Sequence, residues 1–86
     1  MYVVELAFDG TPARLALRPA HRDKLTALHA AGKVRLAGPY ADESGALLVF
    51  DVPDEEALDA IIADDPYYAA DGVRIVRRTQ WNTVVG

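Results

Sequence analysis

The chain contains no cysteine among its 86 residues. This absence excludes disulfide frameworks, thiolate metal sites and cysteine nucleophiles. Long apolar runs are missing too, and no stretch approaches the roughly 20 residues that a membrane-spanning helix needs. The first residues, "MYVVELAF", include neither the positively charged region nor the cleavage site that signal peptides carry. We therefore expect a cytoplasmic protein with no membrane partner.

Positive charge is also scarce, because nine Lys and Arg residues stand against thirteen Asp and Glu residues and leave a net charge of −4 at pH 7. A nucleic-acid-binding surface needs a face that is rich in Lys and Arg. The one cluster of this kind, Arg74, Arg77 and Arg78, is explained by a solvated strand face. We therefore expect no nucleic-acid partner.

Residues that bind cofactors or metals are few. The segment "DGTPARLA" has too few glycines to cradle a phosphate group. The two histidines, His21 and His29, lie eight residues apart without the carboxylates that would complete a metal site. We therefore expect neither a cofactor nor a bound metal ion.

The composition is that of an ordinary globular chain, with 51% hydrophobic and 26% charged residues. Its length fits one domain over residues 1–86. A domain of this size buries only about 60% of the surface that its unfolded chain exposes. Association with a second copy is a common way for such a domain to gain stability.

The hydrophobic pattern predicts four strands and two helices. Strands are expected at residues 2–8, 33–41, 45–52 and 73–81, and helices at residues 19–31 and 53–65. Pro19 is expected in the first turn of the first helix, after a loop that runs to about Leu17, and Gly32 is expected to end that helix. Asp54 is expected to cap the second helix, and Pro66 to end it.

This order of elements, βαββαβ, predicts a ferredoxin-like α+β fold with a four-stranded antiparallel sheet and both helices on one face. Gly38 and Pro39 favour an edge position for the strand at 33–41. The strands at 2–8 and 45–52 are apolar on both faces, yet the helices cover only one face of the sheet. A second copy packed sheet against sheet would cover the other face, so we expect a homodimer.

Each predicted helix carries one ionisable residue on its buried face. His21 lies in an apolar stripe with Leu25 and Leu28, and Asp65 continues the apolar stripe of the second helix. In the predicted topology the first helix begins at the same end of the domain where the second helix finishes. His21 and Asp65 are therefore expected to be neighbours, although 44 positions separate them in the sequence.

A histidine paired with a carboxylate suits acid–base chemistry. At the end of the second helix Asp65 would oppose the helix dipole, and near the start of the first helix a protonated His21 would be disfavoured. A partner such as His21 would offset the first cost, and the second effect favours a neutral imidazole that accepts a proton while the carboxylate orients it. The alternative is that His21 is a satisfied core or capping residue and that Asp65 with Pro66 only ends a helix. The spacing alone leaves both interpretations open.

Three residues are candidate contacts to a substrate. Arg18, with Arg14 nearby, would bind an anionic group, although a solvated charge is the ordinary alternative. Tyr67 would line a pocket, with aromatic packing as its alternative. Gly38, in the predicted edge strand, is the third candidate.

The segments "RPAHRDKLTALHAAGKVRLAGPY" and "ALLVFDVPDEEALDAIIADDPYYAADGV" resemble the YciI-like (YCII-related) proteins over about residues 2–81. The most specific motifs are R-P-x-H at the helix start, L-A-G-P in the edge strand and D-P-Y after the second helix. The resemblance implies a ferredoxin-like fold in the dimeric α+β barrel group, with proteins that associate as dimers. It also implies a His–Asp dyad, which falls on His21 and Asp65.

The resemblance further implies cofactor-free lyase or isomerase chemistry on a small acidic or phenolic molecule. One relative looks like a dehydrochlorinase of a chlorinated hydroxyhydroquinone, and the wider group includes muconolactone isomerase. We expect His21 to act as the general base and Asp65 to orient it. The loop "ADESG" is shorter than in many relatives, so their contacts from this segment do not carry over. The alternative is a non-catalytic dimer that binds a small ligand or serves a partner enzyme, because a fold alone implies no reaction.

Overall fold

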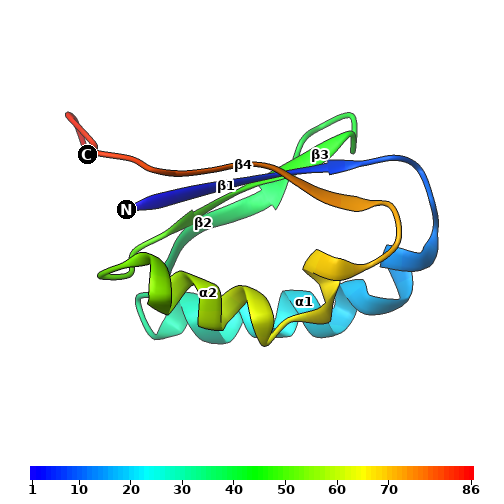
Figure 1. Cartoon of the computed structure of the whole chain (residues 1–86), viewed down its shortest axis with the longest axis horizontal. Helices are drawn as coiled ribbons and strands as arrows, with labels where there is room; N and C mark the ends of the chain where they lie inside the picture. Colours follow the sequence, from blue (N-terminus) through cyan, green and yellow to red (C-terminus); the bar gives the residue numbers. More distant parts are fainter.

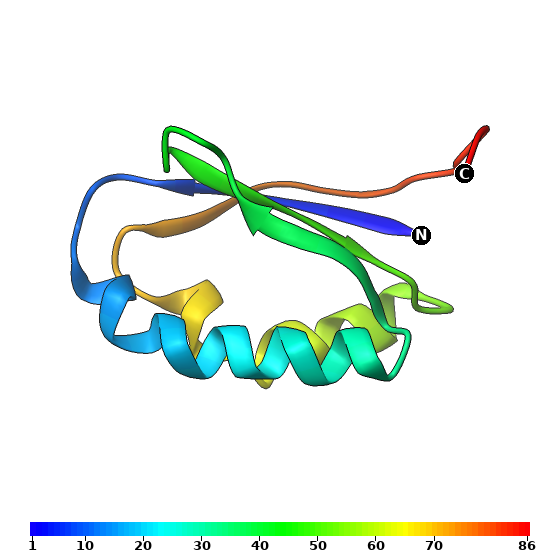
Figure 2. The ribbon, with the colours of Figure 1, turned by 180° about the vertical axis from the view of Figure 1, so that it is seen from behind.

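Four strands form one antiparallel sheet in the order β2-β3-β1-β4, and both helices lie on the same face of it (Figures 1 and 2). The computed structural model describes all residues from 1 to 86. Its elements are β1 (Tyr2–Phe8), α1 (Ala13–Ala30), β2 (Val34–Pro39), β3 (Gly45–Phe50), α2 (Glu55–Ala63), the short 3₁₀ helix η1 (Pro66–Ala69) and β4 (Val73–Gln80). The ferredoxin-like α+β fold and the edge position of β2 are thereby confirmed. No helix combines the length and the apolar character that crossing a bilayer requires.

The core lies between the sheet and the helices. Successive side chains of a strand point to opposite faces, so every second residue of β1, from Tyr2 to Leu6, is buried beneath the helices. The side chains with the least exposure are Val4, Leu6, Leu48, Phe50 and Leu58. Leu58 is the one fully buried residue of α2, and burying a leucine contributes about 1.5–3 kcal/mol. It therefore anchors α2 to the sheet.

Helix α1 begins earlier than the sequence indicates. It starts at Ala13, so the predicted start at Pro19 and the predicted loop to Leu17 were wrong. The segment from Ala13 to Arg18 consists of good helix formers, and Pro12 occupies the N-cap position. Pro19 therefore lies inside the helix. The predicted end is confirmed, because Gly32 follows the helix with a φ of 78°, which glycine adopts readily.

The second helix is shorter than expected, since it covers Glu55–Ala63 rather than 53–65. Its predicted N-cap is confirmed, because the Asp54 carboxylate accepts a hydrogen bond from the Ala57 N–H at 2.8 Å. The two acidic residues of its first turn also stabilise the positive end of the helix dipole. Four of the eight strand ends agree with the predicted bounds, and the other four differ by one or two residues.

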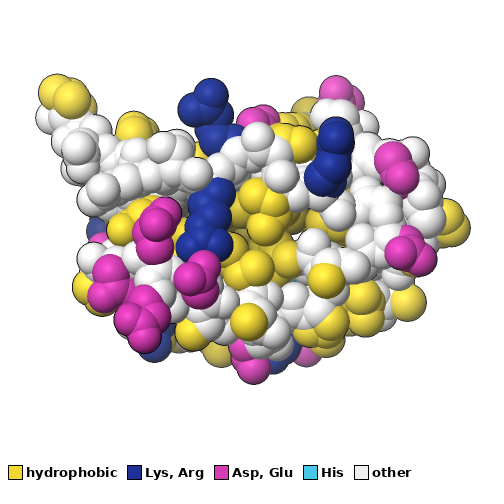
Figure 3. All heavy atoms as spheres, in the orientation of Figure 1, with side chains coloured by type: hydrophobic (Ala, Val, Ile, Leu, Met, Phe, Trp, Pro, Cys, Tyr) yellow, Lys and Arg dark blue, Asp and Glu magenta, His cyan; other side chains and the backbone are white.

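Two apolar surfaces have no covering layer within the chain. On the face of the sheet away from the helices, Leu36 is 72% exposed, although its strand partner Val49 is buried. Leu47 on the same face is 40% exposed. Hydrophobic side chains also show between β4 and α2, where the sheet and the helices separate (Figure 3). Of these two surfaces, the sheet face without helices is the one whose exposure to water most disfavours a single copy.

Because α1 starts at Ala13, Pro19 lies inside the helix, and replacing it tests this helix start. Inside a helix a proline removes one backbone hydrogen bond and costs up to about 3 kcal/mol relative to alanine. Pro19→Ala should therefore raise the free energy of unfolding by about 1–3 kcal/mol in urea denaturation. Pro12→Ala, at the N-cap, is the control and should change it by less than about 1 kcal/mol. A Pro19→Ala variant that is no more stable than the wild type would contradict the observed helix start.

Candidate active site

His21 lies near the middle of α1 and is its one buried residue, with 6% of its surface exposed. The half-buried Leu17 and Leu25 lie one turn before and after it on the same face, which points the imidazole toward the sheet. The expected burial of His21 is therefore observed. Its expected place at the helix start was wrong, so the dipole of α1 does not disfavour a protonated ring.

Asp65 lies outside α2, and the prediction that it continues this helix was wrong. A residue before proline is pushed to extended backbone, and Asp65, before Pro66, has φ −120° and ψ 107°. Its side chain caps η1 instead, since Oδ1 accepts a hydrogen bond from the Tyr67 N–H at 3.0 Å. The carboxylate thus lies at the positive end of a short helix and is stabilised there rather than opposed.

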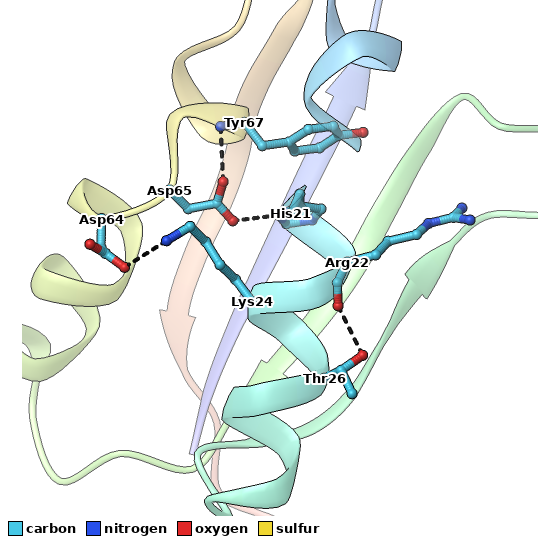
Figure 4. Close-up of polar contacts among 7 residues, drawn as sticks. All are labelled: His21, Arg22, Lys24, Thr26, Asp64, Asp65 and Tyr67. Carbon is cyan, nitrogen blue, oxygen red and sulfur yellow. Dashed lines mark hydrogen bonds and ion pairs between the residues drawn. The ribbon is translucent and has the colours of Figure 1, made fainter. Parts of the chain in front are cut away.

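His21 and Asp65 meet, as expected from the sequence. The distance between Nδ1 of His21 and Oδ2 of Asp65 is 2.5 Å, and Asp65 is 6% exposed (Figure 4). An ionised carboxylate can only accept, so Nδ1 carries the proton and donates it. In a neutral ring this leaves a bare lone pair on Nε2, which makes no hydrogen bond to the protein. The pair therefore has the geometry of a general base with its orienting carboxylate.

Two tyrosines hold the imidazole in place. The Tyr67 ring stacks on it, with centroids 4.0 Å apart and planes 7° apart. The Tyr68 ring meets it edge-on, with centroids 5.4 Å apart and an interplanar angle of 90°. Figure 4 shows Tyr67 parallel to His21 and on the side away from Thr26. Packing on both rings fixes the direction of Nε2.

A cavity of about 560 Å³ lies against His21, between α1 and β2. Such a volume suits a small molecule. His21 and the three candidate contacts Arg18, Tyr67 and Gly38 all line it, whereas Asp65 lies behind His21 and does not. A Cβ at Gly38 would meet no atom within 4 Å, so the wall is open at that position.

Sequence reasoning gave little weight to two other residues of this cavity. Arg14 donates from Nη1 to the Tyr67 hydroxyl at 3.2 Å, and its guanidinium lies 4.0 Å from the centroid of the Phe8 ring. Glu43 reaches the cavity from the turn between β2 and β3. The four-residue spacing of Arg14 and Arg18 was a usable signal, but the predicted loop kept Arg14 off the helix. No local sequence pattern predicts that Glu43 lines the cavity.

The far end of the cavity has a structural histidine. His29 bonds through Nδ1 to the Val34 carbonyl at 2.9 Å and so ties the end of α1 to the start of β2. No group of three or more His, Cys, Asp or Glu side chains lies close enough together to hold a metal ion. The absence of a cofactor and of a metal remains a prediction from the sequence.

The fold and the site define the class of this protein. It is a small βαββαβ protein with a buried His–Asp pair, of which the histidine lines an open cavity. The family model for the YCII-related domain matches residues 1–82. The chain therefore belongs to the YCII-related, or YciI-like, family, and the resemblance inferred from its motifs is confirmed. The comparison with curated proteins gave no match.

Tyr68 gives a test of the packing around His21. Its hydroxyl is buried without a hydrogen-bond partner, and burial, followed by the charge of Asp65, raises the pKa of Tyr68 far above its usual value. A buried hydroxyl without a hydrogen-bond partner destabilises the folded chain, so Tyr68→Phe should raise the free energy of unfolding by about 1 kcal/mol. Tyr67→Phe is the control and should lower it by up to about 1 kcal/mol, because its hydroxyl accepts from Arg14.

The raised pKa of Tyr68 predicts that the stability of the protein depends on pH. The unfolded chain releases the Tyr68 proton near pH 10, whereas the folded chain retains it. The stability linked to Tyr68 is therefore complete below about pH 10 and is lost as the pH rises above that value. Urea denaturation between pH 8 and about 11 should show a growing advantage of Tyr68→Phe over the wild type. A constant difference, or a destabilised Tyr68→Phe, would contradict the observed burial.

Proposed function

We propose that this protein is a cofactor-free enzyme of the lyase or isomerase type, a cytoplasmic homodimer that acts on a small acidic or phenolic molecule. In this proposal His21 is the general base and Asp65 is a positioning residue. One observation carries it: Nδ1 of His21 lies 2.5 Å from Oδ2 of Asp65, and Nε2 has no hydrogen-bond partner in a ring that lines the cavity. The fold by itself supports no particular reaction.

The proposed step is a proton transfer at Nε2. A carbon next to a carbonyl, or a phenol hydroxyl, gives its proton to Nε2, and the electron pair moves onto the substrate oxygen as an enolate or phenolate. The enolate then either expels a leaving group from the neighbouring carbon or takes the proton back at another carbon. These two outcomes are elimination and isomerisation. Such assistance is typically worth about 10²–10⁴-fold in rate.

The surroundings of His21 stabilise the ring once it is protonated. A buried imidazolium needs a counter-charge, and Asp65, itself buried, supplies it within hydrogen-bonding distance. The stacked Tyr67 face attracts a cation as well. The ring keeps its orientation through the step because Nδ1 stays bonded to the same oxygen throughout. The charge therefore develops where the protein already compensates it.

The support for a homodimer is the uncovered sheet face. Leu36 and Leu47 are exposed there, and Tyr40 donates to the Glu5 carboxylate at 2.5 Å on the same face. A second copy that packs sheet against sheet would remove these leucines from water. In this arrangement His21 lies on the opposite side of the sheet from the second copy, whereas Leu36 of the edge strand borders both the cavity and the uncovered face.

The catalytic proposal is tested with proton exchange. Deuterium uptake next to the carbonyl of small keto acids, and at the ring of phenols, is followed by NMR in D₂O. His21→Gln should slow any exchange that the wild type catalyses by about 10²–10⁴-fold, measured at a temperature where circular dichroism shows that the variant is folded. A His21→Gln variant that keeps the exchange rate would favour the alternative, a non-catalytic ligand-binding or accessory protein.

Asp65→Asn tests the positioning role. The amide can still cap η1, but its N–H₂ donates to Nδ1 and moves the ring proton to Nε2, which removes the base. The rate constant should fall by about 10²-fold or more while KM is unchanged. Asp64→Asn is the matched control, because this neighbouring carboxylate is exposed and pairs with Lys24 at 3.0 Å (Figure 4). Equal kinetics in the two variants would contradict the role of Asp65.

The dimer is tested by sedimentation equilibrium. Leu47→Lys places a charge in the middle of the uncovered sheet face and should raise the dimer dissociation constant by at least about tenfold. Leu15→Lys is the matched control, because Leu15 is equally exposed, at 43% against 40%, but lies on α1. A wild type that is monomeric at micromolar concentration would overturn the dimer.

A further inference from the structure

Three arginines follow one another at four-residue intervals along α1, and all three line the cavity: Arg14, Arg18 and Arg22. Side chains at this spacing are neighbours on a helix, and like charges there repel each other. Only Arg18 has a carboxylate within 4 Å, and that contact is long, at 3.8 Å to Glu43. A chain with a net charge of −4 thus gathers unneutralised positive charge beside His21.

Arg14 is held in place with most of its donors unused. The Phe8 ring below it and the Tyr67 hydroxyl beside it fix the guanidinium, which makes that one hydrogen bond to the protein. A guanidinium carries five N–H donors in a rigid fork that matches a carboxylate. Arg14 is therefore fixed in orientation while most of its hydrogen-bonding capacity faces the cavity.

Glu43 occupies an unfavourable backbone conformation next to Arg18. It is the one residue other than glycine with a positive φ, at 57°, in the turn that its N–H closes on the Tyr40 carbonyl at 2.9 Å. Glycine or asparagine is the usual choice at such a position. Glu43 lines the cavity with a side chain that is 63% exposed, and its carboxylate lies 3.8 Å from Arg18, too far for a hydrogen bond. A weakly held carboxylate therefore stands beside this arginine.

We propose that Arg14 and Arg18 form an anion subsite for the carboxylate of a flat, mostly apolar ligand, and that Glu43 takes the place of this carboxylate when no ligand is bound. This inference specifies the substrate class of the proposed enzyme as aromatic carboxylates. It rests on the proposed function only in assuming that His21 then reacts with the bound ligand. Ligand binding itself requires no catalysis. The Glu43 carboxylate is the observation that favours a carboxylate over other anions.

The shape of the ligand follows from the residues around Arg18. Arg18 precedes His21 by three residues, about 4.5 Å along the helix axis, so a small ligand anchored by Arg18 lies close to His21. The walls beside it are apolar or aromatic, with Phe8, Leu25 and Tyr67 among them. A ring that carries a carboxylate fits both the charge and the walls.

The experiment measures binding of benzoate by NMR titration, with benzamide as its neutral isostere and inorganic phosphate as an anion without a ring. Benzoate should bind in the millimolar range, and benzamide and phosphate at least about tenfold more weakly. Arg18→Gln should weaken benzoate by at least about tenfold, and Glu43→Gln should tighten it by about threefold or more. Circular dichroism of each variant verifies the fold.

Arg35→Gln is the control for general positive charge. Arg35 lines the same cavity near the end of α1 and pairs with Asp51 at 3.3 Å. Its loss should change benzoate affinity by less than about twofold. Three results would each overturn the subsite: no benzoate binding at millimolar concentration, equal binding of benzamide, or unchanged benzoate affinity in both Arg18→Gln and Glu43→Gln.

His21→Gln separates this inference from the proposed reaction. The variant should keep the preference for benzoate over benzamide, because the base takes no part in holding the carboxylate. Binding that depends on Arg18, in a protein that catalyses no proton exchange, would leave the subsite standing and overturn the reaction. Proton exchange that depends on His21, without any preference for carboxylates over neutral ligands, would support the reaction and overturn the subsite.

Discussion

The hydrogen bond between His21 and Asp65 is the interaction on which the rest of the structure depends. It joins the middle of α1 to the segment after α2, across 44 positions of sequence, and both partners are almost completely buried. Neither side chain would be tolerated at that depth alone, because a buried charge or an unpaired imidazole is costly. The same bond fixes the ring proton on Nδ1. One contact therefore both stabilises the fold and prepares the base.

The segment Asp65-Pro66-Tyr67 shows how the local sequence builds this contact. Pro66 forces the residue before it into extended backbone, which ends the helical path and turns the Asp65 carboxylate inward. One oxygen of that carboxylate caps η1, and the other holds His21. The cap in turn starts the short helix that carries Tyr67, whose ring stacks on the imidazole. Three consecutive residues thus supply the counter-charge, its conformation and one wall of the cavity.

The sequence predicted the order of elements because strand and helix periods are local properties of the chain. It also placed His21 inward, since helical phase depends on spacing to Leu25 rather than on where the helix begins. The start of α1 was missed because Pro19 imitates a first-turn proline. Asp65 was expected beside His21 for a partly wrong reason, as its conformation comes from Pro66 and not from α2. Glu43 was beyond prediction, because only the folded hairpin brings it to Arg18.

The most direct test of this account is the protonation pattern of His21, read from long-range ¹H–¹⁵N NMR spectra of the wild-type protein near neutral pH. The account predicts a proton on Nδ1, strongly deshielded by its bond to Asp65, and a bare Nε2 whose resonance shifts when a phenol enters the cavity. A proton on Nε2, or a ring that does not respond to any phenol or keto acid, would contradict it.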